Sequence, residues 1–373
     1  MSFFELWQRQ DWDHLALTIN ATTEAEVERA LAAPKLDWRG FRALISPAAS
    51  PYLEPMARRS QALTRRRFGN TMGLYVPLYL SNLCANECDY CGFAMSNRIK
   101  RHTLTDAELD RELEAIKELG FDAILLVTGE HETKVGMAYF RRVLPIIKAR
   151  FSTVMMEVQP LEAGDYAELR ALGLDGVMVY QESYHRPTYG QHHLRGNKQD
   201  FRFRLDTPDR LGQAGVDKIG IGALYGLANW RVEAAMVALH LAYLQRRYWR
   251  SRYSVSFPRL RPCTGGVEPV SPVGERELLQ LICALRLFGP ELELSLSTRE
   301  SALFRDSVMT LGPTSMSAGS STRPGGYADP SDDLAQFSID DDRSPQLVAE
   351  AIAAAGLTPV WKDWDRVFHG LPA

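Results

Sequence analysis

Short apolar runs alternate with amphipathic helical patterns from about residue 72 to residue 320. Eight runs of β-branched or apolar residues predict strands, and most of the stretches between them have the spacing of amphipathic helices. The predicted strands are Leu74–Leu80, Ala123–Val127, Val154–Val158, Gly176–Tyr180, Lys218–Ile221, Tyr253–Phe257, Glu293–Ser297 and a weaker one at Thr314–Ser317. The predicted helices are Asp106–Leu119, Met137–Ala149, Glu162–Leu172, Phe201–Ala214, Trp230–Trp249 and Glu275–Phe288.

This alternation of strands and helices indicates an α/β fold with a parallel sheet. Eight strands over about 250 residues are the number and length of a (β/α)8 TIM-type barrel. An open doubly wound sheet would give a similar pattern, but no Gly-x-Gly-x-x-Gly turn follows the first predicted strand and no P-loop sequence occurs. We therefore predict a barrel over residues 72–320, a helical N-terminal extension over 1–71 and a C-terminal tail over 321–373. Residues 24–31 and 52–67 predict helices in the extension, and 345–355 one in the tail.

The composition is that of an ordinary globular protein, with 45% hydrophobic and 24% charged residues in 373 positions. The formal net charge of −3 favours neither nucleic acid nor anionic lipid as a partner. The sequence lacks a run of about 18 apolar residues and a secretory signal at its start. We expect a cytoplasmic protein with no nucleic-acid or membrane partner.

Three of the five cysteines, Cys84, Cys88 and Cys91, fall within eight residues directly after the first predicted strand. Asn, Asp and Gly residues in this segment predict a loop, which in a barrel lies at the catalytic C-terminal face. Three clustered thiolates without a fourth suit an iron–sulfur cube that keeps one iron open for a ligand. Zinc is the alternative, but it prefers a fourth local ligand, and the nearest histidine in sequence, His102, comes eleven residues after Cys91.

The spacing Cys-x3-Cys-x2-Cys, with Tyr90 before the last cysteine, resembles the motif of the radical S-adenosylmethionine (SAM) enzymes. The resemblance implies a [4Fe-4S] cluster on the three cysteines and SAM on the open iron. Later segments resemble the cofactor-binding positions of that family in the same order. They are Thr128-Gly129-Glu130 for the methionine amino group, Glu157 for the ribose and Arg204 for the methionine carboxylate. Singly, each charged residue could instead be a helix cap or a solvated surface charge, and Thr128 replaces a glycine of the family motif.

Segments over nearly the whole chain resemble the aromatic amino acid lyases of this superfamily, and most closely the thiamine-pathway tyrosine lyases. These segments are Phe68–Asn70, Val76–Asn82, Met156–Pro160, Tyr180–His185, Arg261–Gly266, Ser297–Glu300 and Pro359–Trp364. The tyrosine lyase of hydrogenase maturation carries a second cluster on C-terminal cysteines, whereas no cysteine follows Cys283 here. A tryptophan lyase shares the barrel and stays an alternative, as does a zinc-stabilised binding module without enzymatic activity.

The resemblance implies cleavage of the Cα–Cβ bond of L-tyrosine to 2-iminoacetate and p-cresol, with 5′-deoxyadenosine and methionine formed from SAM. The family pattern assigns Arg299 to the substrate carboxylate, which an arginine can bind through two hydrogen bonds, with Ser317 and Tyr79 beside it. Tyr180, Gln181 and Glu182 are expected to line the cavity. The expected partners are a thiazole synthase, which would take up the easily hydrolysed product, and a flavodoxin- or ferredoxin-like electron donor.

Overall fold

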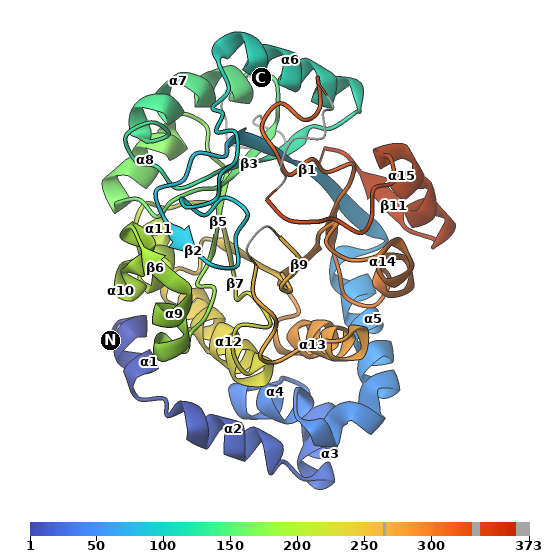
Figure 1. Cartoon of the computed structure of the whole chain (residues 1–373). Coiled ribbons are helices and arrows are strands. Elements are labelled where there is room, and N and C mark those ends of the chain that lie inside the picture. Colours follow the sequence, from blue (N-terminus) through green and yellow to red (C-terminus); the bar gives the residue numbers. More distant parts are fainter. Residues whose placement is uncertain (264–265, 330–335, 363–373) are drawn as a thin grey trace.

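The computed structural model describes residues 1–263, 266–329 and 336–362 (Figure 1). Within these ranges, eight parallel strands close into a barrel, because the last of them pairs back to the first. In spatial order they are β1 (Thr71–Ser81), β3 (Ala123–Thr128), β4 (Thr153–Glu157), β5 (Gly176–Tyr180), β7 (Lys218–Gly222), β8 (Arg252–Ser256), β9 (Glu293–Leu296) and β10 (Ser315–Ser317). The predicted α/β barrel is confirmed, and each predicted strand overlaps an observed one.

Helices surround the barrel, as expected of alternating strands and helices (Figure 1). They are α6 (Asp106–Glu118), α7 (Met137–Lys148), α8 (Ala163–Ala171), α9 (Arg186–His192), α10 (Phe201–Leu205), α11 (Thr207–Gln213), α12 (Trp230–Arg247), α13 (Glu275–Phe288) and α14 (Ala302–Val308). The single helix predicted over 201–214 is wrong, since α10 and α11 are separate there. Pro208, the second residue of α11, has no N–H to donate to the carbonyl four residues earlier, so the helical ladder breaks there.

The N-terminal extension is helical, as predicted, and lies along one side of the barrel (Figure 1). Its helices are α1 (Phe3–Gln8), α2 (Trp12–Asn20), α3 (Glu24–Ala32), α4 (Trp38–Leu44) and α5 (Leu53–Phe68), with a 3-10 turn at Pro47–Tyr52. Trp38 Nε1 donates to the Ala235 carbonyl at 2.7 Å, and Gln280 Nε2 donates to the Leu44 carbonyl at 2.8 Å, which ties α4 to α12 and α13. The division of the chain into three regions, with boundaries after residues 71 and 320, remains a prediction.

Residues 336–344, which we call the crossing segment, precede α15 (Pro345–Ala354) and β11 (Thr358–Val360). Gln336 and Phe337 of this segment lie at the barrel mouth, where they contact Cys91 and Arg299. Strand β11 pairs in parallel with the first residues of β1, so the tail adds a strand to the sheet. Asp341 anchors the crossing segment through ion pairs with the fully buried Arg305 of α14 and with Arg343. Of the helices that the structure describes, none has both the length and the apolar character needed to cross a lipid bilayer.

Candidate active site

The three clustered cysteines lie in the loop that follows β1 at the carboxyl end of the barrel. The short strand β2 (Glu87–Cys88) fixes this loop by pairing antiparallel with β6 (His193–Arg195). The Asn86 N–H donates to Cys84 Sγ at 3.5 Å, and Gln336 Nε2 donates to Cys91 Sγ at 3.7 Å. Burial is the main cause that raises the pKa of all three thiols above the usual value, so their thiolates need a bound cation to form at neutral pH.

Within the described residues, no three His, Cys, Asp or Glu side chains converge as the ligands of one metal ion must. A four-iron cube makes a different demand, because each thiolate ligates a separate iron. A loop that carries one buried and two half-buried thiols, with N–H donors directed at two of the sulfurs, fits such a cube.

Strand β3 ends directly against the cysteine loop. A Cβ placed on Gly129 would lie 2.4 Å from the Leu83 carbonyl oxygen, so only glycine fits at this position. The Gly129 N–H donates to the Ser81 carbonyl at 2.9 Å, and the Ala85 N–H donates to the Glu130 carbonyl at 2.8 Å. Thr128, Gly129 and Glu130 therefore pack on the loop through main-chain contacts.

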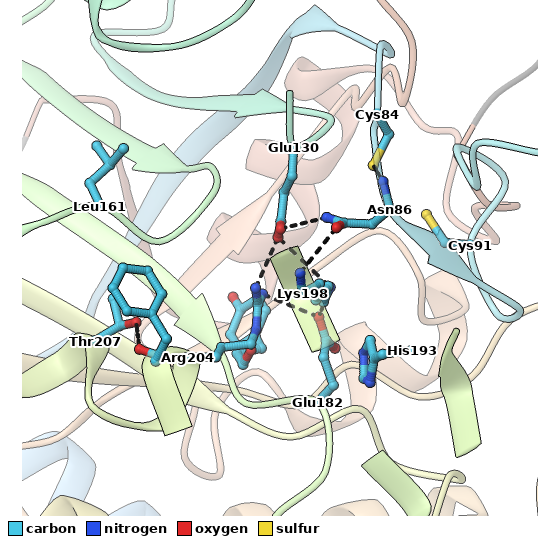
Figure 2. Close-up of polar contacts among 12 residues, drawn as sticks. Cys84, Asn86, Cys91, Glu130, Leu161, Glu182, His193, Lys198, Arg204 and Thr207 are labelled. Carbon is cyan, nitrogen blue, oxygen red and sulfur yellow. Dashed lines mark hydrogen bonds and ion pairs between the residues drawn. The ribbon is translucent and has the colours of Figure 1, made fainter. Parts of the chain in front are cut away.

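Four charged side chains meet beside this loop and form what we call the charge quartet, Glu130, Glu182, Lys198 and Arg204 (Figure 2). Arg204 Nη1 lies 2.9 Å from Glu130 Oε1, and its Nη2 lies 3.5 Å from Glu182 Oε1. Lys198 Nζ lies 2.8 Å from Glu182 Oε1 and 3.9 Å from Glu130 Oε1. These side chains are between 7% and 15% exposed, so water screens their charges weakly.

Burial opposes ionisation of both acids, but the two cations outweigh it and hold the pKa of Glu130 and of Glu182 below the usual value. The acids in turn overcome the cost of burial for the cations and raise the pKa of Lys198 and of Arg204. The charge quartet is thus fully ionised and electrically neutral. Such a site suits a zwitterion, which can face one acid and one base at once.

The charge quartet is connected to the cysteine loop by Asn86, whose Nδ2 donates to Glu130 Oε2 at 2.8 Å while its Oδ1 accepts from the Lys198 N–H at 3.0 Å (Figure 2). A cavity of about 230 Å³ adjoins it and is lined by Asn86, Glu130, Gln159, Lys198 and Arg204, among others.

Glu182 is the non-glycine residue with positive φ, at 66°, among the residues described. A side chain in this region costs on the order of 1–3 kcal/mol, and surrounding contacts must hold it there. The Leu224 N–H donates to the Glu182 carbonyl at 2.8 Å, and buried Glu233 of α12 accepts from Ser183 Oγ at 2.5 Å and from the Tyr184 N–H at 2.8 Å. This strained turn directs the Glu182 carboxylate into the charge quartet.

Tyr90 is held by a histidine on β6. Tyr90 Oη lies 2.7 Å from His193 Nε2, and His193 Nδ1 lies 2.6 Å from the Tyr189 carbonyl. Because a carbonyl only accepts, Nδ1 carries the proton and Nε2 accepts from the tyrosine hydroxyl. Burial first, and then Lys198, lower the pKa of His193 to about 2, so the ring stays neutral.

The residues predicted to hold the substrate line a second, smaller cavity of about 90 Å³ inside the barrel mouth. It is bordered by Tyr79, Glu157, Tyr180, Arg299 and Ser317, among others. The Arg299 guanidinium lies 3.4 Å from the centroid of the Phe337 ring, and Ser317 Oγ accepts from the Thr298 N–H at 3.1 Å. Burial lowers the pKa of Arg299 and raises that of Glu157 to about 7, although Arg299 partly opposes the second shift.

Polar groups are left without partners where two strands reach the mouth. Within the described part of the chain, Thr128 Oγ1 and both polar atoms of the Gln181 amide are buried and make no hydrogen bond. Because a buried polar group without a partner is costly, these groups suit a polar ligand at the barrel mouth.

The structure divides the residues predicted from sequence between two places. Glu130, Glu182 and Arg204 meet in the charge quartet, whereas Tyr79, Glu157, Tyr180, Arg299 and Ser317 border the smaller cavity. Sequence reasoning missed four residues of the site, because each lies in a loop without a periodic pattern. They are Lys198, Asn86, Gln336 and Phe337. Gly196 is the one sequence signal for the loop that carries Lys198, because glycine is the residue that a positive φ requires. Its φ is 88°, and a Cβ there would collide with Asn86 Oδ1.

The two remaining cysteines are outside this thiol cluster. Cys263 Sγ donates to the Tyr90 carbonyl at 3.1 Å, and Cys283 is fully buried in α13, where it is part of the hydrophobic core. A third cavity, of about 680 Å³, lies at the opposite end of the barrel and shares Tyr75, Leu125 and Tyr180 with the smaller one.

Two family models match the chain. The Radical SAM superfamily matches residues 78–238, and the Biotin and Thiamin Synthesis associated domain matches residues 256–358. Two curated relatives are both named 2-iminoacetate synthase. The one from Escherichia coli K12 is 63% identical over 98% of this chain and 97% of its own length. The one from Salmonella typhimurium LT2 is 62% identical over the same shares.

Solved structures agree with the fold. The [FeFe]-hydrogenase maturase HydG from Carboxydothermus hydrogenoformans has a TM-score of 0.87 and 29% identity over 96% of this chain and 84% of that one. Methylornithine synthase PylB has a TM-score of 0.72 over 92% of this chain and 99% of that one, and at 20% identity it supports the fold alone.

Proposed function

The chain belongs to the radical SAM superfamily and, within it, to the 2-iminoacetate synthases, and from this premise we propose how its residues carry out the reaction. It is a tyrosine lyase that cleaves the Cα–Cβ bond of L-tyrosine to 2-iminoacetate and p-cresol for the thiazole of thiamine. The observation that carries this function is 63% identity over 98% of the chain, joined to a three-cysteine loop at the barrel mouth.

Cys84, Cys88 and Cys91 would hold the [4Fe-4S] cluster, and the residues of the charge quartet beside this loop would hold SAM. The bound, reduced cluster would supply an electron for the reductive cleavage of SAM, and this chemistry would start the reaction by removing a hydrogen atom from the substrate amino group. The buried thiols support this assignment, since a metal removes the cost of forming their thiolates.

The amino acid end of SAM is a zwitterion, and the charge quartet offers groups of both signs. Glu130 receives the methionine amino group and Arg204 receives the carboxylate. Glu157, Thr128 and Gly129 at the strand ends, with Tyr90, Tyr180, Gln181 and Glu182, bind the rest of the cofactor. The unpaired amide of Gln181 and hydroxyl of Thr128 support a polar ligand at this point.

Arg299 binds the substrate carboxylate. Its guanidinium is stacked on Phe337 and is therefore held in one orientation, which a two-point hydrogen bond requires. Ser317 and Tyr79 border the same cavity and place the substrate relative to the adenosyl carbon. A displacement of about 1 Å between reacting groups can cost on the order of 100-fold in rate.

The crossing segment after β10 excludes water from these steps. Phe337 covers Arg299, and the Asp341–Arg305 ion pair fixes the chain four residues later. A radical in this cavity is thus shielded from solvent and from side reactions.

The product assay tests the reaction directly. Anaerobically reconstituted enzyme is incubated with SAM, a reductant and either tyrosine or tryptophan, and the released aromatic product is identified. Release of p-cresol from tyrosine is expected. Turnover of tryptophan alone would assign the chain to the tryptophan lyases, and a protein that takes up zinc but no iron would overturn the radical mechanism.

A substitution tests the role of Arg299. Arg299→Ala is expected to keep about four irons per chain and to bind SAM normally, but to raise the KM for tyrosine at least tenfold, because the substrate loses a charge-assisted hydrogen bond worth about 1.5–3 kcal/mol. Arg66→Ala, on the exposed side of α5, is the matched control and should leave KM unchanged. Equal KM values in both variants would remove Arg299 from the substrate site.

Because 2-iminoacetate hydrolyses readily, direct transfer to a thiazole synthase would protect it. We also propose a flavodoxin- or ferredoxin-like electron donor and a cytoplasmic location. The helical N-terminal extension and the acidic tail are the candidate docking surfaces. Co-purification of tagged enzyme with a thiazole synthase, lost when the extension is masked by an antibody fragment, is the expected result. Binding that survives both masking of the extension and charge reversal at Asp342 and Glu350, which are exposed acids of the tail, would rule these surfaces out.

A further inference from the structure

Gln336, in the segment that crosses the barrel mouth, contacts both the cysteine loop and the substrate cavity. Its carbonyl accepts from the Gly92 N–H at 3.1 Å. Its side-chain Oε1 accepts from the Tyr79 hydroxyl at 2.7 Å, and its Nε2 donates to Cys91 Sγ at 3.7 Å. One amide therefore links a cluster ligand to a residue of the substrate cavity.

The direction of these bonds is fixed by chemistry. The Tyr79 hydroxyl has one proton to give, and it is directed at Oε1, so the amide N–H groups face the sulfur. An N–H donor to a cluster thiolate stabilises the extra negative charge that one-electron reduction adds. Removal of the donor therefore lowers the reduction potential.

The neighbouring contacts keep Gln336 in place without its side chain. The Gln336 N–H donates to the Thr322 carbonyl at 3.1 Å, and Phe337 packs on Arg299. The donor to Cys84 Sγ is the main-chain N–H of Asn86, which only a proline substitution would remove, and proline would also change the backbone of the loop. Gln336 is therefore the contact that mutagenesis can separate from the loop itself.

We propose that Gln336 is a positioning residue that raises the reduction potential of the cluster through Cys91 and at the same time fixes the Tyr79 hydroxyl in the substrate cavity. The inference rests on the function proposed above. It explains why a residue 245 positions after Cys91 closes over the cysteine loop.

The test separates the contact of the Gln336 amide with Cys91 from its contact with Tyr79. Gln336→Met keeps the side-chain length and removes both contacts, whereas Tyr79→Phe removes the hydroxyl contact alone. Gln346→Met, at an exposed position of α15, is the control. The readouts are the midpoint potential from an anaerobic redox titration followed by electron paramagnetic resonance, and the ratio of p-cresol to 5′-deoxyadenosine.

Gln336→Met is expected to retain about four irons, to shift the potential to a more negative value and to form p-cresol about tenfold more slowly, as is typical when an outer-shell partner of a metal site is removed. Tyr79→Phe should keep the wild-type potential and lower the product ratio. An unchanged potential in Gln336→Met, or an equal shift in Tyr79→Phe, would overturn the proposal.

If Gln336→Met loses iron, Gln336→Glu is a second variant that tests the same contact with Cys91. It keeps an acceptor for Tyr79 and replaces the donor by a negative charge, so the potential should fall at least as far. Release of p-cresol by the wild-type enzyme is scored separately, and its absence would reject the proposed function while the potentials still decide the role of Gln336.

Discussion

Replacement of Lys198 by methionine should destabilise the protein, because it leaves two carboxylates against one guanidinium in the charge quartet. Lys198 Nζ lies 2.8 Å from Glu182 Oε1, and its side chain is 11% exposed. Loss of one partner from a buried ion pair costs about 3–5 kcal/mol. An unfolding entropy of about 2.1 cal/mol/K per residue gives about 0.8 kcal/mol/K for 373 residues, so the expected fall in Tm is about 4–6 °C.

Differential scanning calorimetry of the reconstituted enzyme under argon measures this loss. The double variant Lys198→Met/Glu182→Gln again balances one acid with one base, and it should recover most of the lost Tm. Lys35→Met, at an exposed position of the N-terminal extension, should change the stability by about 0.5 kcal/mol at most. A single variant as stable as the wild type, or a double variant less stable than the single one, would refute this account of the charge quartet.

Three further predictions concern other parts of the site. The pKa of Glu157 is raised from 4.5 to about 7, so the stability that its protonated form contributes is complete below pH 4.5 and is lost as the pH rises through 7. Glu157→Gln has no such loss, and its stability relative to the wild type should therefore increase by up to about 3 kcal/mol between pH 4.5 and 8. Tm values measured across this pH range test the prediction. Gly129→Ala should abolish iron uptake, since its Cβ would collide with a backbone oxygen of the cysteine loop, whereas Gly164→Ala, with open space around it, should keep full iron content. Asp341→Asn should cost about 3–5 kcal/mol in chemical denaturation, because it leaves the buried Arg305 without a countercharge.

The cysteine loop could be predicted from sequence because its information is local. Cys84, Cys88 and Cys91 stand close together after an apolar strand, and the barrel pattern alone places that strand end at the mouth. Thr128 and Glu157 could be predicted for the same reason, since each ends a strand of the barrel.

Lys198 and Gln336 could not be predicted, because their roles arise from contacts between distant segments. Lys198 follows β6, a strand of three residues that exists only through its pairing with β2. Gln336 lies in a polar segment without helical or strand periodicity, and its partner Cys91 is 245 residues earlier. β11 was missed for a similar reason, since three residues with one proline predict no strand until β1 offers an edge.

The order of the chain has a consequence for the maturation of the enzyme. At a synthesis rate of about 5–20 residues per second, the 245 residues from Cys91 to Gln336 take about 12–50 s to appear. Throughout this interval the nascent protein carries all three thiols, while the segment that will cover them is still unmade. A cluster inserted during this interval would therefore meet thiols that Gln336 does not yet cover, whereas a cluster inserted later would have to pass the crossing segment.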